Sequence, residues 1–278
     1  MNERNERNSS SGAPGSAALA EALLPLKIAY DAALYGASQD RSTAATGPCY
    51  LRLDLALVGD VPSMNGNHAA FPGVAAPTSR AEIQAMLALY REHGVSTFFV
   101  EVSPCAQREA IRAWLREAGL VPFGGAGYPT LLRATSEPAT APACGLRIAP
   151  LGADEAWDRM DELRDAIGSG EWAEKLARAT AAPHVRGFAA FDGDRLVAAA
   201  GLFVGGPVGY LGVTGTRASH RRRGAQGALI AARLQASRDL GLGWCVSETL
   251  YALTSSFNNL RRAGFAVAYE RELWTPGR

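Results

Sequence analysis

The second half of the chain alternates strand patterns with helix patterns, and this order limits the folds that it can adopt. Apolar residues recur at helical spacing in Asp154–Ile167, and three runs rich in β-branched and aromatic residues precede the next helix. Asp192-Gly193-Asp194 separates the first two runs and predicts a hairpin, because glycine readily adopts positive φ. Strand, helices, three strands, helix, strand, helix, strand is the order of a mixed α/β sheet. The expected elements are Leu146–Leu151, Asp154–Ile167, Val185–Phe191, Arg195–Val204, Gly209–Thr216, Gly224–Leu240, Gly243–Leu250, Ser255–Ala263 and Phe265–Trp274.

The first half carries a weaker copy of this ending. A shift of 145 positions places Phe98–Pro104 on Gly243–Thr249 without a gap. Helix Ala81–His93 takes the place of Gly224–Leu240 with a slip of about two residues. Residue identity between the copies is low, so two unrelated α/β segments are the alternative. We interpret the pattern as a duplicated architecture.

The predicted domains follow from these copies and from two polar segments. Residues 1–24 are expected to be a disordered tail, because their opening is too poor in large apolar groups to offset the entropy of ordering. Residues 25–133 form the degenerate copy, and residues 145–278 the complete one. The Pro-, Ala- and Thr-rich stretch 134–144 is the predicted linker.

The composition of the chain limits which binding partners and which cellular compartment we expect. The formal net charge of +1 gives no general attraction for nucleic acid or anionic lipid. No apolar run approaches the roughly 18–20 residues of a membrane span, and the N-terminus lacks a secretory signal. Cys49, Cys105, Cys144 and Cys245 are far apart, which favours buried thiols over a disulfide framework or a metal site. We therefore expect a cytoplasmic protein without metal, nucleic-acid or membrane partners; a homodimer is compatible with the sequence.

The segment Val213–Leu229 carries the chemistry. A strand ends near Thr216, a loop contains three consecutive arginines, and a helix begins at Gly224. The first turn of a helix leaves amides without intrahelical partners, and the helix dipole adds positive charge there. A diphosphate at this end would receive amide hydrogen bonds and arginine contacts. The alternative is a surface loop with solvated arginines. Neither a P-loop nor a dinucleotide fingerprint is present.

This segment resembles the acetyl-CoA-binding motif of the GCN5-related N-acetyltransferase (GNAT) superfamily, Arg/Gln-x-x-Gly-x-Gly/Ala. The motif runs here from Arg221 to Gln226, and Gln226 departs from the small residue of the pattern. The resemblance covers about residues 145–274 and includes the strands and helices on either side of the loop. It implies two GNAT-like domains in tandem, of which the N-terminal one is degenerate.

The resemblance also implies where acetyl-CoA binds as co-substrate. The strand from Val213 through Thr214 to Thr216 would splay from its neighbour and pair with the pantetheine arm. An asparagine of the short helix after the next strand, Asn258 or its neighbour Asn259, would contact the coenzyme. The loop and helix start would hold the pyrophosphate through Arg221, Arg222, Arg223, Gly224, Ala225, Gln226 and Gly227. The corresponding turn of the first half, residues 78–82, has no glycine, so a second coenzyme site is not expected.

Acyl transfer to an amine needs a base for the amine and an acid for the departing thiolate. Glu248 is the first candidate base, because it ends a strand where open α/β sheets form crevices. Tyr210 and Tyr251 are lesser candidates, and the amide near Thr214 is the expected oxyanion donor. The family's usual acid, a tyrosine four residues before the closing glycine, is Leu260 here. Water or another tyrosine would have to serve.

Two histidines and two tryptophans have less specific expected roles. His220 lies in the arginine loop and is expected to contact phosphate or solvent, and His184 is expected in a loop. Trp157 and Trp172 lie on the helices that cover the acceptor site in GNAT proteins, as core or as pocket wall. The leading functional hypothesis is transfer of an acyl group, by default acetyl, to the primary amine of a small molecule or amino acid. The alternatives are a non-catalytic acyl-CoA sensor or scaffold and a protein N-acetyltransferase.

Overall fold

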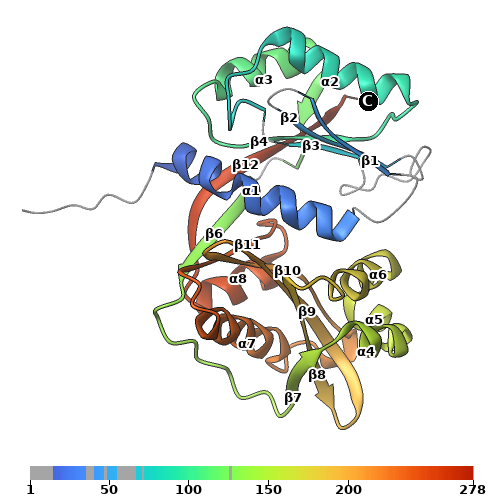
Figure 1. The fold of residues 1–278 in the computed structure, drawn as a ribbon, viewed down its shortest axis with the longest axis vertical. Coiled ribbons are helices and arrows are strands. Elements are labelled where there is room, and N and C mark those ends of the chain that lie inside the picture. The colour runs from blue at the N-terminus through green and yellow to red at the C-terminus, as the bar shows by residue number, and fades with distance from the viewer. Residues whose placement is uncertain are drawn as a thin grey trace, which may run out of the picture.

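One continuous sheet runs through both halves of the protein. The computed structural model describes residues 15–35, 41–46, 49–54, 67–70, 72–124 and 127–277. Within these residues the strand order is β1-β2-β3-β4-β12-β6-β11-β10-β9-β8-β7, and β5 pairs with β12. Helices pack on both faces of the strands (Figure 1). The mixed α/β class predicted from the sequence is confirmed.

The C-terminal half begins with an antiparallel meander. It consists of β7 (Arg147–Leu151), β8 (Val185–Asp192), β9 (Arg195–Gly205) and β10 (Val208–Thr216). Gly193 adopts φ 60° in the turn between β8 and β9, as the hairpin pattern predicts. Helix α7 (Ala225–Asp239) then crosses over to β11 (Trp244–Glu248), which pairs in parallel with β10. A parallel pair requires such a crossover.

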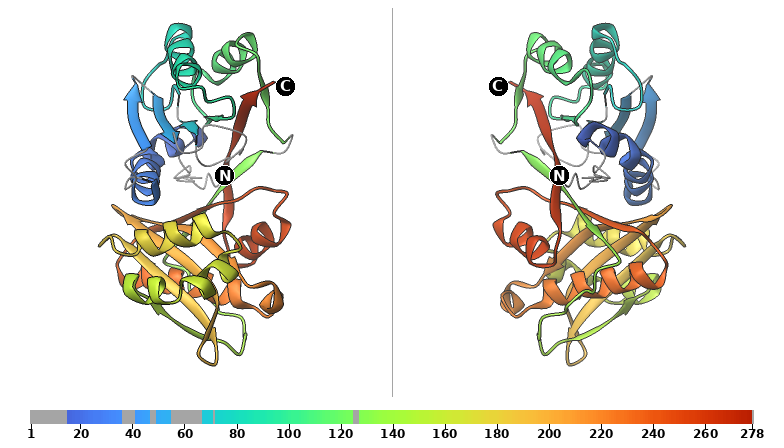
Figure 2. Two further views of the ribbon diagram at one scale, coloured as in Figure 1. Left: turned by 90° about the vertical axis from the view of Figure 1, so that its right-hand side faces the viewer. Right: turned by 90° about the vertical axis from the view of Figure 1, so that its left-hand side faces the viewer.

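Alternate side chains of β8 face two different helical layers. Phe188 and Ala190 pack in the core under α7 and α8 (Thr254–Arg262), whereas Ala189 and Phe191 face the other layer. That layer consists of α4 (Ala153–Asp158), α5 (Met160–Ile167) and α6 (Gly170–Ala179). Figure 2 shows the yellow-green helices of this layer on one face and the orange α7 on the other. The single helix expected at Asp154–Ile167 is wrong, because the backbone leaves the helical region at Arg159 (φ −105°, ψ 26°).

The N-terminal half repeats the parallel unit of the C-terminal half. Strand β3 (His68–Ala70) pairs in parallel with β4 (Phe99–Val102), and α2 (Arg80–Glu92) connects them. Helices α2 and α7 begin 145 positions apart, and so do β4 and β11, so the expected slip of two residues is wrong. The duplicated architecture itself is confirmed. The remaining elements of this half are β1 (Arg41–Thr46), β2 (Cys49–Asp54), α3 (Arg108–Glu117), β5 (Leu120–Pro122) and β6 (Tyr128–Ala134).

The last strand of each half pairs with strands of the other half. Strand β6 belongs by sequence to the first half, yet it lies between β11 and the first part of β12 (Ala266–Pro276). The second part of β12 lies between β4 and β5 of the first half. Figure 1 shows β12, in red, running from the lower to the upper half. The segment after β6 has neither helix nor strand up to residue 146, but the predicted boundary does not separate two sheets.

Helix α1 (Ser16–Tyr35) replaces part of the expected tail. Residues 1–14 lie outside the described residues, but the predicted tail boundary at residue 24 is wrong. Ala20, Leu23 and Leu26 are buried against a core that includes Tyr210 of β10 and Tyr269 of β12. Pro25 lies inside this helix and argues against it at the sequence level, since proline lacks the amide that a helix interior uses. Burial of one apolar face outweighs that loss.

We predict that truncating the centre of β6 destabilises both halves together. Leu131 is fully buried between β11 and β12, so Leu131→Ala should lower the free energy of unfolding by about 2–5 kcal/mol. Val121→Ala on β5, where the side chain is 46% exposed, is the control and should change it by less than about 0.5 kcal/mol. Urea unfolding measures the change. Hydrogen exchange should show protection lost in β4 as well as in β11; loss confined to β11 would contradict shared stability.

Candidate active site between the open strand and the interface of the halves

The N-terminus of α7 is open. A 3₁₀ turn (Ala218–His220) follows β10, Arg222 and Gly224 adopt positive φ (62° and 83°), and α7 begins at Ala225. Gly224 at the N-cap position offers no side-chain hydrogen bond. Among the described residues, none accepts a hydrogen bond from the amides of Ala225, Gln226 or Gly227. These three donors are therefore available for an anion.

The equivalent end of α2 is closed by its own side chains. Ser79 Oγ accepts from the Glu82 amide at 3.2 Å, and Glu82 Oε2 accepts from the Ser79 amide at 2.7 Å. This capping box places a carboxylate where α7 leaves its amides open. The hydrogen bonds from Ser79 lower the pKa of Glu82, so the carboxylate is ionised at neutral pH. An anion is thus repelled from α2, in line with the expectation that the first half has no coenzyme site.

The three arginines of the loop differ in their contacts. Arg221 Nε donates to the Thr216 carbonyl at 3.2 Å. Arg223 and His220 both contact Asp192 Oδ2 at 3.1 Å, and these hydrogen bonds lower the pKa of the Asp192 carboxyl. The side chain of Arg222 has no recorded partner within the described residues. Arg221 and Arg222 thus have no carboxylate partner among the described residues, so both keep an uncompensated charge at the helix end.

The glycines of the motif are required by contacts within the chain. A Cβ at Gly224 would lie 3.1 Å from Cys144 Cβ, and one at Gly227 would lie 2.7 Å from Pro142 Cγ. The predicted linker thus packs against the first turn of α7. Close packing against the linker is therefore a second reason for glycine at these two positions. The loop pattern alone did not indicate it.

Strand β10 separates from β11 beside this helix end. Their pairing stops after Tyr210 and Val246, and the register of β10 against β9 slips between Gly212 and Thr214. Ser247 Oγ donates to the Leu211 carbonyl at 3.0 Å across the point of separation. The rest of β10 therefore presents backbone groups to open space, which is the splay that the resemblance implied for residues 213–216.

A cavity of about 440 Å³ passes through this opening. Gln226, Ile230 and Leu260 line it from the α7–α8 side, and Tyr30 and Trp172 line it from the α1–α6 side. Val213 and Thr214 lie between the two sides. Thr249, also in the lining, is buried and its Oγ1 has no hydrogen-bond partner among the described residues. The cavity thus connects the open helix end with the interface of the two halves.

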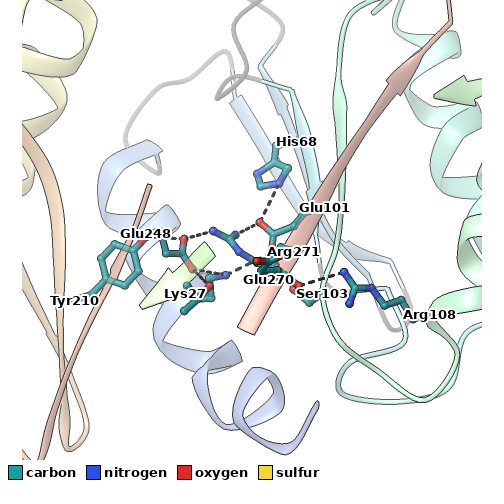
Figure 3. A network of polar contacts seen from close by, with 10 residues as sticks. Lys27, His68, Glu101, Ser103, Arg108, Tyr210, Glu248, Glu270 and Arg271 are labelled. Atoms are coloured by element: carbon teal, nitrogen blue, oxygen red, sulfur yellow. Dashed lines mark hydrogen bonds and ion pairs between the residues drawn. The ribbon is translucent and has the colours of Figure 1, made fainter. Parts of the chain in front are cut away.

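Four buried charges meet at the far end of the cavity (Figure 3). Glu248 Oε1 lies 2.7 Å from Lys27 Nζ, and Glu248 Oε2 lies 2.7 Å from a terminal nitrogen of Arg271. Glu101 on β4 binds the same two cations, Lys27 at 3.4 Å and Arg271 at shorter range. His68 Nε2 lies 3.7 Å from Glu101. We call Lys27, Glu101, Glu248 and Arg271 the charge cluster. Sequence reasoning identified only Glu248 of these four residues.

The carboxylate of Glu248 is surrounded by four donor side chains. Besides Lys27 and Arg271, its carboxylate accepts hydrogen bonds from Tyr210 at 2.7 Å and Thr130 at 3.0 Å. Burial alone would raise the pKa of Glu248, but the attraction of Arg271 and Lys27 outweighs it and the pKa is lowered. Such a carboxylate has neither a free lone pair nor the basicity that a general base needs. This arrangement argues against the predicted role of Glu248 as the base.

Tyr210 donates its hydrogen bond to the same charge cluster. Burial, followed by the nearby Glu248 charge, raises the pKa of Tyr210 well above its ordinary value, so the phenol stays protonated as a donor to Glu248. Its predicted role as an alternative base is therefore not favoured either. Tyr251 is not part of the cavity lining, and its hydroxyl donates to Glu270 Oε1 at 2.5 Å.

The remaining predicted residues divide into those at the cavity and those away from it. Asn258 is exposed, whereas Asn259 donates a hydrogen bond to the Gln226 side chain, so the neighbouring asparagine is the one that faces α7. Leu260 is buried, and no acid stands at its position. Trp172 is a pocket wall, while Trp157 is 45% exposed and is neither core nor wall of this cavity.

Among the described residues, no group of three or more His, Cys, Asp or Glu side chains could hold a metal ion. No helix within them is long and apolar enough to cross a membrane. Cys105, Cys144 and Cys245 are free thiols; the side chain of Cys49 lies outside the described residues.

Comparison with solved structures supports the assignment of the fold. A GCN5-related N-acetyltransferase from Kribbella flavida aligns at TM-score 0.62 and 17% identity, over 96% of this chain and 97% of that one. One from Sphaerobacter thermophilus aligns at TM-score 0.63 and 14% identity, over 94% and 89%. A tandem GNAT protein from the clavulanic acid biosynthesis pathway aligns at TM-score 0.60 and 14% identity, over 86% and 84%. No family model and no curated protein matches the chain. The protein has the tandem GNAT fold.

We predict that the charge cluster stabilises the fold down to acidic pH. The attraction of Arg271 and Lys27 overcomes burial and lowers the pKa of Glu101 to about 2, against about 4.3 in an unfolded chain. Because the folded pKa is the lower one, this stabilisation is present above about pH 4.3 and is lost as the pH falls toward 2. Glu101→Gln should lower the free energy of unfolding at pH 7 by about 3–5 kcal/mol, since it leaves a buried cation undercompensated.

The control is Glu117→Gln, which removes an exposed pair with Arg80 and should cost less than about 1 kcal/mol. Urea unfolding between pH 7 and pH 2.5 measures both variants. The gap between Glu101→Gln and the unaltered protein should narrow with falling pH. A gap that is constant across this range would show that Glu101 acts by packing rather than by charge.

Proposed function

We propose that the protein is an acyl-CoA-dependent N-acyltransferase that transfers an acyl group, by default acetyl, to the primary amine of a small molecule or amino acid. The observation that carries this proposal is the open N-terminus of α7 beside the splayed edge of β10. The closed end of α2 in the same chain supports it, because the duplicated helix without this opening carries a capping carboxylate instead.

Acyl-CoA fits the two sets of backbone groups present. The amides of Ala225, Gln226 and Gly227 suit a pyrophosphate, with the unpaired charge of Arg222 nearby. The amides and carbonyls of β10 beyond Tyr210 suit the amide groups of a pantetheine arm, which would add to the sheet as a strand does. The thioester would then reach the bulge at Val213, where a strand amide can donate to its oxygen.

The amine would enter from the opposite side of the sheet. Tyr30, Leu34, Trp172 and Tyr128 line that end of the cavity, so the N-terminal half shapes the acceptor compartment. Since the carboxylates of the charge cluster are already paired, the amine would lose its proton to solvent rather than to Glu248. A compartment of this size favours a small acceptor over a protein segment.

We predict that a carboxylate at the start of α7 weakens acyl-CoA binding without weakening the fold. Gln226→Glu places a negative charge in the first turn, where the helix dipole stabilises it but where it repels a pyrophosphate. The dissociation constant of acetyl-CoA should rise by about tenfold or more, equivalent to about 1.4 kcal/mol, while the melting temperature stays equal or rises. Calorimetry of the unaltered protein should show one acetyl-CoA per chain.

Gln235→Glu is the matched control, because it makes the same change on an exposed position near the other end of α7. Its dissociation constant should stay within twofold of the unaltered protein. Equal effects of the two variants, or no acetyl-CoA binding at all, would refute the proposed site. A thiol-release assay with a panel of amines then separates an enzyme from a sensor, which would bind acetyl-CoA but release no thiol.

A further inference from the structure

Strand β10 carries one extra residue close to the place where it leaves β11. Gly212 is the last residue before the slip in register, and it pairs with Gly201 of β9. The next pair joins Thr214 to Ala200, so Val213 lies between the two pairs without a partner of its own. The pairing of β10 with β11 has already ended at this point. An extra residue of this kind turns the backbone away from the regular ladder, and the proposed function places the thioester at this bulge.

A buried arginine of α7 holds the bulge. Nη1 of Arg233 donates to the carbonyl of Gly201 at 3.1 Å and to that of Gly212 at 3.2 Å, which are the two residues of the last regular pair. Its Nε donates to the Leu229 carbonyl of the same helix at 3.1 Å, and this contact fixes the side chain on α7. Arg233 therefore joins α7 to both strands where the bulge begins.

The hydrogen bond to Gly212 determines where the next amide points. The Gly212 carbonyl and the Val213 amide belong to one peptide group, and the described residues contain no cis peptide bond. In a trans peptide the C=O and N–H bonds point in opposite directions, so the Val213 amide points away from the guanidinium. A charged donor on the carbonyl also polarises the peptide group, which makes its N–H a stronger donor.

The charge of Arg233 has no carboxylate partner among the described residues. The side chain is 1% exposed and lines the cavity. Burial lowers the pKa of Arg233 to about 10, which still leaves it charged at neutral pH. Burial of a cation that only carbonyls bind costs free energy, and an apolar side chain at this position would avoid the cost. Packing therefore does not explain the arginine, whereas its contacts at the bulge do.

The duplicated helix offers a comparison within the chain. Because α2 and α7 begin 145 positions apart, Ala88 of α2 stands at the position of Arg233. Helix α2 is the one whose N-terminus is closed by a capping box. The duplicated unit as such thus does not require an arginine at this position, and the arginine occurs on the helix with the open end.

We infer that Arg233 is a positioning residue of the acyl transfer, which holds the Gly212 carbonyl so that the Val213 amide meets the thioester oxygen; this role rests on the proposed function. When the amine nitrogen bonds to the carbonyl carbon, an electron pair moves to the oxygen, and the amide stabilises the negative charge there. The pair returns as the carbon–sulfur bond breaks, and the electrons of that bond leave on sulfur. The nitrogen loses a proton to solvent, and the thiolate takes one from solvent.

Arg233→Met tests this role, because it keeps an extended side chain and removes the donors. We expect kcat to fall by about 10²-fold, the effect of losing one donor to an oxyanion, with the dissociation constant of acetyl-CoA within about twofold of that of the unaltered protein. Infrared spectroscopy of bound acetyl-CoA with an isotope-labelled carbonyl measures the hydrogen bond itself. The carbonyl stretch should move to lower frequency on binding to the unaltered protein, and by less on binding to Arg233→Met.

Two further variants keep the test decisive. Arg233→Lys keeps the charge but not the guanidinium fork, so its kcat and its infrared shift should both lie between those of Arg233→Met and the unaltered protein. If Arg233→Met does not fold, Arg233→Lys decides alone, by whether its infrared shift falls together with its kcat.

Arg238→Met is the matched control. Arg238 lies on the same helix and also donates to two backbone carbonyls, those of Thr135 and Ser136, but it is not part of the cavity lining. Its kcat and its infrared shift should equal those of the unaltered protein.

The outcomes separate this inference from the proposed function. If the unaltered protein binds acetyl-CoA and releases thiol but the Arg233 variants keep the full infrared shift, Arg233 does not position the amide, whatever their kcat, and the proposed function stands. If the unaltered protein binds acetyl-CoA without thiol release to any amine, or does not bind it, the proposed function fails and the role of Arg233 fails with it.

Discussion

Arg271 binds two buried carboxylates, one from each half, and the arrangement of the molecule depends on this contact. It lies on β12, where the pairing of this strand changes from β6 to β4. Its guanidinium contacts Glu101 and Glu248 and lies over the ring of Tyr128 at 4.2 Å. A charge buried to this extent is stable only when it is paired, so removal of either half leaves a charge uncompensated. The cluster thereby fixes how the halves meet.

The strand exchange and the charge cluster together explain the shape of the candidate site. Exchange of β6 and β12 joins β4 to the strands of the second half, and helix α1 packs against β10. One wall of the cavity consequently comes from the half whose own helix end is closed by a capping box. Duplication left two equivalent helix ends, and the difference between Ser79 with Glu82 and Gly224 with Gly227 makes one closed and the other open. The two copies therefore differ at this point: one leaves amide donors open at its helix end, and the other closes its helix end and lines part of the cavity.

Local patterns predicted most of the elements, and long-range contacts account for the errors. The hairpin at Gly193, the loop before α7 and the 145-residue offset were visible because they depend on nearby residues. Helix α1 was missed, since Pro25 and a polar beginning outweigh its apolar face until that face has a partner. Glu248 lies in the cavity lining, but its contacts argue against a role as the base, because Lys27 and Arg271 reach it from segments far away in the sequence.

The sequence by itself determined the mixed sheet, the duplicated unit and the helix end that can receive a phosphate. Each of these follows from hydrophobic period, from glycine conformations and from unpaired amides within about 20 residues of one another. Only the tertiary structure decided which strands each half exchanges, which carboxylates are paired, and which side chains line the cavity beside the open strand. The physical reason is that the pairing of charges depends on their distance in space, and the pKa values depend on that pairing. The paired groups are far apart along the chain; Lys27 and Arg271, for example, are separated by 244 positions.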